Sequence, residues 1–243
     1  MASRNPEQPN FLFILSDDQG SWAMNCAGNE EIRSPNLDRL AREGIRFENF
    51  FCTSPVCSPA RASIVTGRIP SQHGVHDFVS MPHDREGKPD LDVPSNSIHF
   101  LADMPTYAEM LTELGYDTCL SGKWHLGDSL QPRCGFQTWY PMPYGQSSFR
   151  NVPMVEDGEL TVHEGTYATD LFTDNALKFL ARQVDTERPF CLNLHYTAPH
   201  RPWGRENHPE NIWDDYYNNC PFDSTPGLDE PLPPGFQRYN FER

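Results

Sequence analysis

The sequence of 243 residues contains no apolar run that approaches the roughly 20 residues of a membrane-spanning helix. The stretch Met1 to Gln8 is polar and does not look like a signal peptide. We therefore expect a cytoplasmic protein from the chain as written, or a periplasmic or secreted one if a leader was removed. No internal repeat is visible. No Cys-x-x-Cys pair occurs, so a structural zinc site is not expected.

Basic residues are scarce. Lys and Arg number 19 against 34 Asp and Glu, which gives a formal net charge of −15 at pH 7. This balance argues against nucleic acid as a partner, because phosphate binding needs a basic footprint. It also argues against binding to an anionic membrane surface. Any site for an anionic substrate must therefore be a locally positive pocket.

The seven cysteines are odd in number and irregular in spacing, so they do not form a disulfide framework. Cys119 and Cys191 lie in apolar, strand-like runs and are expected to be inert core thiols. Cys57 could also be a buried structural thiol, but its surroundings are unusual. Ser58 can cap a helix and Pro59 suits a first turn, which would place Cys57 just ahead of a helix N-terminus that favours an anion. Arg61 adds a planar cation there, unless it forms only a surface ion pair.

The order of patterns along the chain predicts an α/β fold with a mostly parallel sheet sandwiched by helices. Apolar runs predict strands at 10–16, 45–52, 116–121 and 190–196. Amphipathic stretches with start and stop signals predict helices at 34–44, 57–67, 106–115 and 168–182. Long polar segments at 69–103 and 128–165 are interpreted as functional loops, and 204–243 as an irregular tail.

In parallel α/β sheets, ligands bind beyond the carboxyl ends of the strands. The residues that we select on chemical grounds all fall at that edge: Asp17, Asp18, Cys57, Lys123, His125 and His200. The two aspartates offer oxygen ligands for Ca²⁺ or Mg²⁺, although such a pair can also cap a turn. Trp124 separates Lys123 from His125 on an extended segment and is expected to pack elsewhere.

Other histidines carry weaker hypotheses. His195 is interpreted as structural because it lies inside a strand run. His73, His76 and His83 occupy the long loop after the Cys57 helix, where they either line a substrate entrance or are simply solvated. Arg201 and Trp203, beside His200, are weak candidates for substrate contacts.

Three segments in order resemble the type I sulfatases of the alkaline phosphatase superfamily. They are Cys57–Arg68 with its C-x-P-x-R pattern, the GKWHLG run at Gly122–Gly127, and Pro9–Gly20 with Asp17 and Asp18. The resemblance covers most of residues 9–203. It makes 1–203 the N-terminal part of a catalytic domain, and 204–243 a tail or the start of a missing portion.

The resemblance implies that a separate maturation enzyme converts Cys57 to formylglycine, whose hydrate is the nucleophile. It implies a Ca²⁺ or Mg²⁺ ion held by Asp17, Asp18 and the hydrate at position 57. Arg61 would orient the hydrate, Lys123 would hold a sulfate oxygen, and His125 would contact the hydrate as a candidate base. His200 would contact the sulfate or the leaving oxygen.

Family members are longer, and they complete the metal site with a later Asp followed by Asn or His, and add a later Lys. Asp174-Asn175 is the only candidate by letters, but it falls inside an amphipathic helix. We therefore expect the chain to be an N-terminal portion, incomplete at its C-terminus, and inactive or very weak alone.

The function expected from the sequence is hydrolysis of sulfate monoesters of small molecules or saccharides, the aromatic loops favouring a sugar. One alternative is a phosphonate or phosphate monoester hydrolase of the same superfamily. The other is a non-catalytic truncated fragment.

Overall fold

The structure, a computed structural model, describes residues 8–80 and 99–224. The chain divides into two compact units, one formed by Met1–Gln19 and Glu48–Pro209, the other by Gly20–Phe47 and Glu210–Arg243. Within the described residues no helix is long and apolar enough to cross a membrane.

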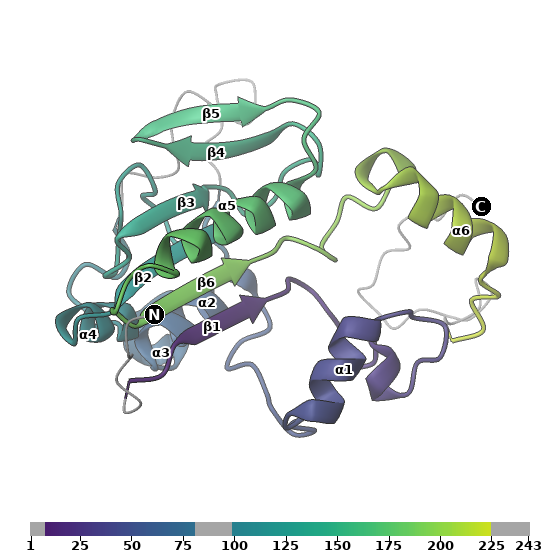
Figure 1. Cartoon of the computed structure of the whole chain (residues 1–243), viewed down its shortest axis with the longest axis horizontal. Coiled ribbons are helices and arrows are strands. Elements are labelled where there is room, and N and C mark those ends of the chain that lie inside the picture. Colours follow the sequence, from purple (N-terminus) through teal and green to yellow (C-terminus); the bar gives the residue numbers. More distant parts are fainter. Residues whose placement is uncertain (1–7, 81–98, 225–243) are drawn as a thin grey trace. The chain divides into compact units, whose positions relative to one another are not determined.

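The first unit is built on a four-stranded sheet in the order β1-β6-β2-β3 (Figure 1). Its strands are β1 (Phe11–Leu15), β2 (Asp117–Lys123), β3 (Thr138–Met142) and β6 (Phe190–His195). All neighbouring strands run parallel. The predicted parallel sheet is confirmed, and so are the apolar runs that predicted β1, β2 and β6.

Helices cover both faces of this sheet. Cys119 packs in a cluster with Phe172 and Phe179 of α5 (Ala168–Gln183). Its neighbour Leu120 packs in a second cluster, with Ala62 of α2 (Cys57–Thr66) and Ala108 of α4 (Tyr107–Glu113). Successive side chains of a strand point to opposite faces, so α5 lies on one face and α2 and α4 on the other.

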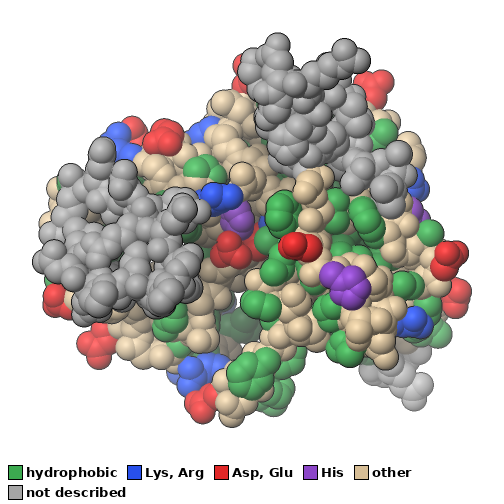
Figure 2. Space-filling view, turned by 180° about the vertical axis from the view of Figure 1, so that it is seen from behind, with side chains coloured by type: hydrophobic (Ala, Val, Ile, Leu, Met, Phe, Trp, Pro, Cys, Tyr) green, Lys and Arg blue, Asp and Glu red, His purple; other side chains and the backbone are tan. Residues whose placement is uncertain are grey.

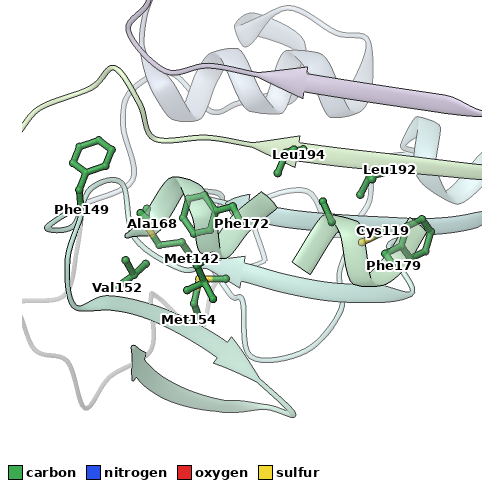
Figure 3. Packing of buried hydrophobic residues seen from close by; sticks show 12 residues of the cluster. Cys119, Met142, Phe149, Val152, Met154, Ala168, Phe172, Phe179, Leu192 and Leu194 are labelled. Carbon is green, nitrogen blue, oxygen red and sulfur yellow. The ribbon is translucent and has the colours of Figure 1, made fainter. Parts of the chain in front are cut away.

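The cluster under α5 is shown in Figure 3, where Phe179 lies beside Cys119, and Phe172 lies beside Ala168 and Met142. Burying each large apolar side chain stabilises the fold by about 1.5–3 kcal/mol. Figure 2 shows that hydrophobic side chains also reach the surface, mixed with charged ones.

The predicted strand at 45–52 is wrong, because these residues form neither a strand nor a helix. Phe51 is 82% exposed. A strand needs a neighbour to receive its ladder hydrogen bonds, and none of the described strands pairs with this segment.

The two segments interpreted as long loops hold more structure than expected. The second contains β3 and an antiparallel hairpin of β4 (Val152–Glu156) and β5 (Glu159–His163). The first contains the short helix α3 (Pro70–His73). Residues 81–98 of that segment, including His83, lie outside the described residues.

The tail is not irregular throughout. The short 3₁₀ turn η2 (Arg205–Asn207) belongs to the first unit, and α6 (Glu210–Asn219) to the second. With α6 the second unit contains η1 (Asn25–Ala27) and α1 (Pro35–Glu43). Arg33 links its two segments, pairing with Asp215 at 2.5 Å and lying 4.4 Å above the Tyr216 ring.

Candidate active site

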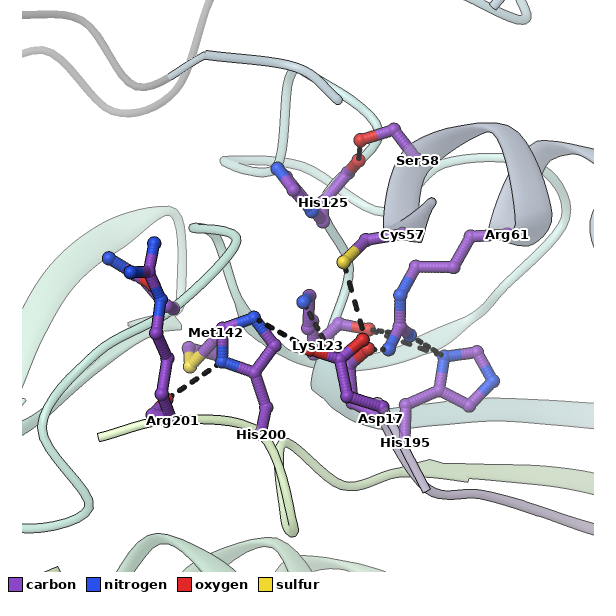
Figure 4. A network of polar contacts seen from close by, with 12 residues as sticks. Asp17, Cys57, Ser58, Arg61, Lys123, His125, Met142, His195, His200 and Arg201 are labelled. Atoms are coloured by element: carbon purple, nitrogen blue, oxygen red, sulfur yellow. Dashed lines mark hydrogen bonds and ion pairs between the residues drawn. The ribbon is translucent and has the colours of Figure 1, made fainter. Parts of the chain in front are cut away.

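The predicted site residues gather at the carboxyl edge of the parallel sheet (Figure 4). Asp17 follows β1, Lys123 ends β2, and His200 follows β6, while Cys57 opens α2. One ligand atom each from Asp17, Cys57 and His200 lies within 4.8 Å of the other two. The topological argument made from the sequence is therefore confirmed for these four residues.

The start of α2 differs from the prediction. Ser58 is not its cap, because the helix begins at Cys57 after Val56, and no side chain caps it. The buried Ser58 hydroxyl instead donates to the His125 carbonyl and accepts from the Val79 amide, both at 2.9 Å. It ties α2 to two loops, and Cys57 occupies the first helical position.

Arg61 is buried, with 3% exposure, so its alternative as a surface ion pair is wrong. Its Nη1 donates to the Lys123 carbonyl at 3.0 Å and lies 3.2 Å from Nδ1 of His195. Its Nη2 lies 3.5 Å from Oδ2 of Asp17. One helix side chain therefore contacts three strand ends.

Lys123 is fully buried and pairs with the same Asp17 carboxylate. Burial raises the pKa of Asp17, but the charges of Arg61 and Lys123 outweigh burial and hold that pKa below its usual value. The carboxylate is therefore ionised at neutral pH. The buried part of the site holds two cations against this one anion, as expected of a positive pocket in an acidic chain.

Cys57 is not an activated thiolate. Its Sγ lies 3.7 Å from Oδ1 of Asp17, as a thiol donating to a carboxylate. Burial raises the pKa of the Cys57 thiol, Lys123 lowers it, and Asp17 raises it again, so that the net shift is upward. Burial is the largest cause of this upward shift, so Cys57 stays a thiol although it opens a helix.

His125 is held in a left-handed backbone conformation, with φ of 56°. Its Nε2 lies 2.9 Å from the Val79 carbonyl, which can only accept, so Nε2 carries the proton and Nδ1 presents a lone pair. Nδ1 is buried and has no hydrogen-bond partner among the described residues. Burial and the Lys123 charge lower the pKa of His125 to about 3.

Two glycines that sequence reasoning did not select keep this geometry. A Cβ on Gly145 would lie 2.4 Å from Cε1 of the His125 ring. A Cβ on Gly122, whose φ is +105°, would lie 2.0 Å from the His195 carbonyl oxygen. The GKWHLG run contained Gly122, whereas nothing in the sequence pointed to Gly145 or Val79, and Ser58 was expected only as a helix cap.

His200 lies near both Asp17 and Asp18. Its Nδ1 donates to the Arg201 carbonyl at 2.7 Å, so Nε2 is the ring nitrogen that faces the aspartates. Nε2 lies 3.5 Å from Oδ2 of Asp18, whose side chain is mostly exposed. Asp18 therefore reaches the site beside His200.

A divalent cation fits this donor set in part. Asp17 and Asp18 provide hard carboxylate oxygens, and residue 57 would provide a further oxygen once its sulfur is replaced. Ca²⁺ takes 6–8 oxygen ligands, more than these residues offer. Asp174 is exposed and Asn175 is buried in α5. The candidate metal group of acidic, His and Cys side chains found among the described residues consists of Asp17, Cys57 and His200, and it includes neither Asp18 nor Asp174.

Of the other residues considered in the sequence, Trp124 and His73 are buried. Trp124 packs with Phe136 and Trp139, as expected. His73 is not at an entrance: it is buried, with Nδ1 accepting from the Val75 amide and Nε2 3.0 Å from the Ser63 hydroxyl.

The other side chains lie nearer solvent. His76 is exposed. Arg201 donates through Nε to the Gln146 side chain at 3.1 Å, and Trp203 donates to the Pro199 carbonyl at 2.9 Å.

Known proteins resemble this chain over most of its length. A family model described as Sulfatase matches residues 9–226. The N-acetylglucosamine-6-O-sulfatase of Bacteroides thetaiotaomicron is 35% identical over 224 residues, covering 86% of this chain and 36% of that protein. The N-acetylgalactosamine-6-sulfatase of Homo sapiens is 32% identical over 225 residues, covering 83% of this chain and 41% of that protein. The chain thus spans well under half the length of these two relatives.

Solved structures agree. One, described as a complex with its substrate D-glucosamine-2-N,6-O-disulfate, superposes with a TM-score of 0.67 at 35% identity, covering 86% of this chain and 40% of that one. A second, described as a complex with k-i-k-neocarrahexaose, has a TM-score of 0.68 at 27% identity. The match covers 80% of this chain and 46% of that one.

Proposed function

This chain belongs to the sulfatase family, and from that premise we propose that it carries the nucleophile side of an active site that hydrolyses sulfate monoesters of saccharides. Its parallel sheet between helices is the alkaline phosphatase-like fold of that family. A sugar substrate is supported by relatives named as amino-sugar sulfatases and by the saccharide complexes of similar structures.

The observation that carries the proposal is the state of Cys57. Its thiol lies among two buried cations and a carboxylate, yet burial keeps it protonated and therefore a poor nucleophile. A site with this much positive charge suits an anionic substrate, but the sulfur does not suit the attack. Conversion of Cys57 to formylglycine by a maturation enzyme resolves the conflict, because the hydrated aldehyde attacks through oxygen.

The reaction then balances without a further reagent besides water. One hydroxyl of the hydrate loses its proton and attacks sulfur, and the bond from sulfur to the alcohol oxygen breaks as that oxygen takes up a proton. The second hydroxyl then loses its proton as its oxygen forms the aldehyde double bond, the bond from carbon to the sulfated oxygen breaks, and sulfate leaves. Water adds to the aldehyde and restores the hydrate. A serine could accept the sulfo group but could not eject it in this way.

Individual residues of this chain have distinct roles in these reaction steps. Arg61 and Lys123 supply the positive potential for the sulfate oxygens and for the hydrate. His125 presents Nδ1 as the acceptor of the proton that the hydrate loses. A bound anion would raise the low pKa of His125 by opposing the Lys123 charge. His200 is placed to contact the sulfate or the leaving oxygen.

A bound Ca²⁺ or Mg²⁺ would polarise the sulfate ester as a Lewis acid. Asp17, Asp18 and the oxygen at position 57 are the residues that would hold it. Because these donors fall short of a full Ca²⁺ shell, we expect the 243-residue chain alone to bind the ion weakly and to turn over poorly.

The test must therefore not depend on turnover. The Cys57→Ser variant is incubated with Ca²⁺ and N-acetylglucosamine-6-sulfate, and the peptide holding residue 57 is analysed by mass spectrometry. Gain of one sulfo group supports the proposal, with Cys57→Ala as the control that stays unmodified. A gain from nitrophenyl phosphate but not from nitrophenyl sulfate would instead assign a phosphate ester hydrolase.

Maturation is measured separately. The wild-type chain is produced together with a formylglycine-generating enzyme, and loss of sulfur at residue 57 is expected in its peptide mass. A wholly unmodified Cys57, with no sulfo transfer to the serine variant, would identify a non-catalytic fragment.

A further inference from the structure

His195 contacts Arg61, one of the proposed catalytic groups, but it is buried next to that group and is not itself one of them. It ends β6 and is only 2% exposed. Its Nδ1 lies 3.2 Å from Nη1 of Arg61, and its ring meets the ring of Phe13 edge-on, with centroids 6.0 Å apart. Figure 4 shows the imidazole turned toward the Arg61 guanidinium, on the side away from Cys57.

The chemistry of arginine fixes the tautomer of this histidine. A guanidinium has only donors, so the short contact is an N–H of Arg61 donating to an unprotonated Nδ1. The proton of the neutral ring is then on Nε2. In this tautomer the Lys123 carbonyl, 3.3 Å from the same Nδ1, receives no hydrogen bond from the ring, and the Nε2–H is buried without a partner among the described residues; the other tautomer would donate to that carbonyl but could not accept from Arg61.

Nη1 of Arg61 is consequently saturated. It carries two hydrogens, and it has two acceptors, the Lys123 carbonyl at 3.0 Å and Nδ1 of His195 at 3.2 Å. Since the guanidinium is planar, fixing both hydrogens of Nη1 also fixes the direction of Nη2. Nη2 faces the Asp17 carboxylate, at 3.5 Å.

We propose that His195 is a positioning residue, which, as the neutral Nε2-protonated tautomer, fixes the orientation of Arg61 toward Asp17 and the nucleophile. The effect on catalysis rests on the proposed function, whereas the effect on Arg61 does not. A protonated ring would place a third cation against Arg61 and Lys123 and would lose the acceptor. Burial and the Arg61 charge lower the pKa of His195 to about 3, which keeps the acceptor at working pH.

The first measurement needs no substitution. The ¹⁵N shifts and proton couplings of the His195 ring in the wild-type chain are expected to show an unprotonated Nδ1 and a protonated Nε2. The opposite tautomer, or a charged ring at pH 7, would overturn the proposal, because neither can accept from Arg61.

The second measurement compares two variants by NMR of the Arg61 guanidinium. Hindered rotation gives distinct Nη1 and Nη2 signals in the wild type. His195→Asn, whose Oδ1 can stand in for Nδ1, is expected to keep them distinct. His195→Leu, which has no acceptor, is expected to merge them while circular dichroism shows that the chain remains folded. Distinct signals in the leucine variant would contradict the role.

The third measurement is the rate of sulfo transfer to residue 57 in the Cys57→Ser variant. The rate of sulfo transfer at saturating substrate is expected to fall roughly 10- to 100-fold with His195→Leu, as when other orienting groups are removed. It should recover with His195→Asn. If Arg61 responds as expected but no variant transfers a sulfo group, the proposed function fails and the positioning role stands.

Discussion

Gly122 is the residue whose replacement the geometry penalises most clearly. It pairs with His195 across the β2–β6 ladder, and its φ is +105°. An added Cβ would lie 2.0 Å from the His195 carbonyl oxygen and 2.9 Å from the carbonyl carbon. Both atoms belong to the backbone, so no side chain can rotate away.

The cost of Gly122→Ala has two parts. A positive φ costs an L-residue about 1–2 kcal/mol. To restore ordinary contact the two strands must separate, which overpacks the sheet at about 1–3 kcal/mol and weakens ladder hydrogen bonds worth about 0.5–1.5 kcal/mol each. We expect a total loss of about 3–5 kcal/mol, a large part of the roughly 5–15 kcal/mol that stabilises a domain.

Gly115→Ala is the matched control. Gly115 lies in the same unit and has a φ of +88°, but a Cβ there meets nothing within 4 Å. It should cost only the conformational part, about 1–2 kcal/mol. Urea unfolding followed by circular dichroism measures both. Equal losses in the two variants would show that the close approach of Gly122 to His195 does not destabilise the chain.

Three further predictions follow from the site. Gly145→Ala is expected to displace the buried His125 ring, to lower sulfo transfer sharply and to cost about 1–3 kcal/mol of unfolding free energy through overpacking; unchanged transfer would contradict the packing. Ser58→Ala removes a donor and an acceptor from buried groups and should cost about 1–3 kcal/mol of unfolding free energy, against no loss if those contacts are dispensable. Acid should destabilise the fold: His125 and His195 have pKa values of about 3 when folded against 6.5 otherwise. Their stabilisation is complete above pH 6.5 and is lost, by up to about 1.4 kcal/mol per pH unit each, as the pH falls toward 3. Unfolding free energies that are equal at pH 7 and pH 5 would refute this.

The sheet edge could be predicted because its signal is local. β1, β2 and β6 are apolar runs, as buried parallel strands must be, and the polar residues that follow them fall at one edge whatever the strand order. Asp17, Lys123 and His200 could therefore be predicted at this edge without knowing which strands pair with each other.

Features that depend on distant partners could not be predicted in this way. Ser58 has the propensity of a helix cap, but its hydroxyl bonds to His125 and Val79 instead. Residues 45–52 have the composition of a strand, yet pairing decides whether a strand forms. His73 lies in a polar stretch, but its ring is buried against Ser63.

The acidity of the whole chain is compatible with the proposed anionic substrate, because exposed and buried charges act over different distances. Exposed charges beyond a Debye length, about 8 Å at physiological ionic strength, are largely screened, whereas buried ones are screened much less. Lys123 and Arg61 are buried beside the nucleophile, and only one of their charges is balanced by Asp17. The field that the proposed sulfate group would meet at Cys57 is therefore set mainly by these three side chains and by the nearby Asp18 carboxylate, and the net charge of −15 has little influence on it.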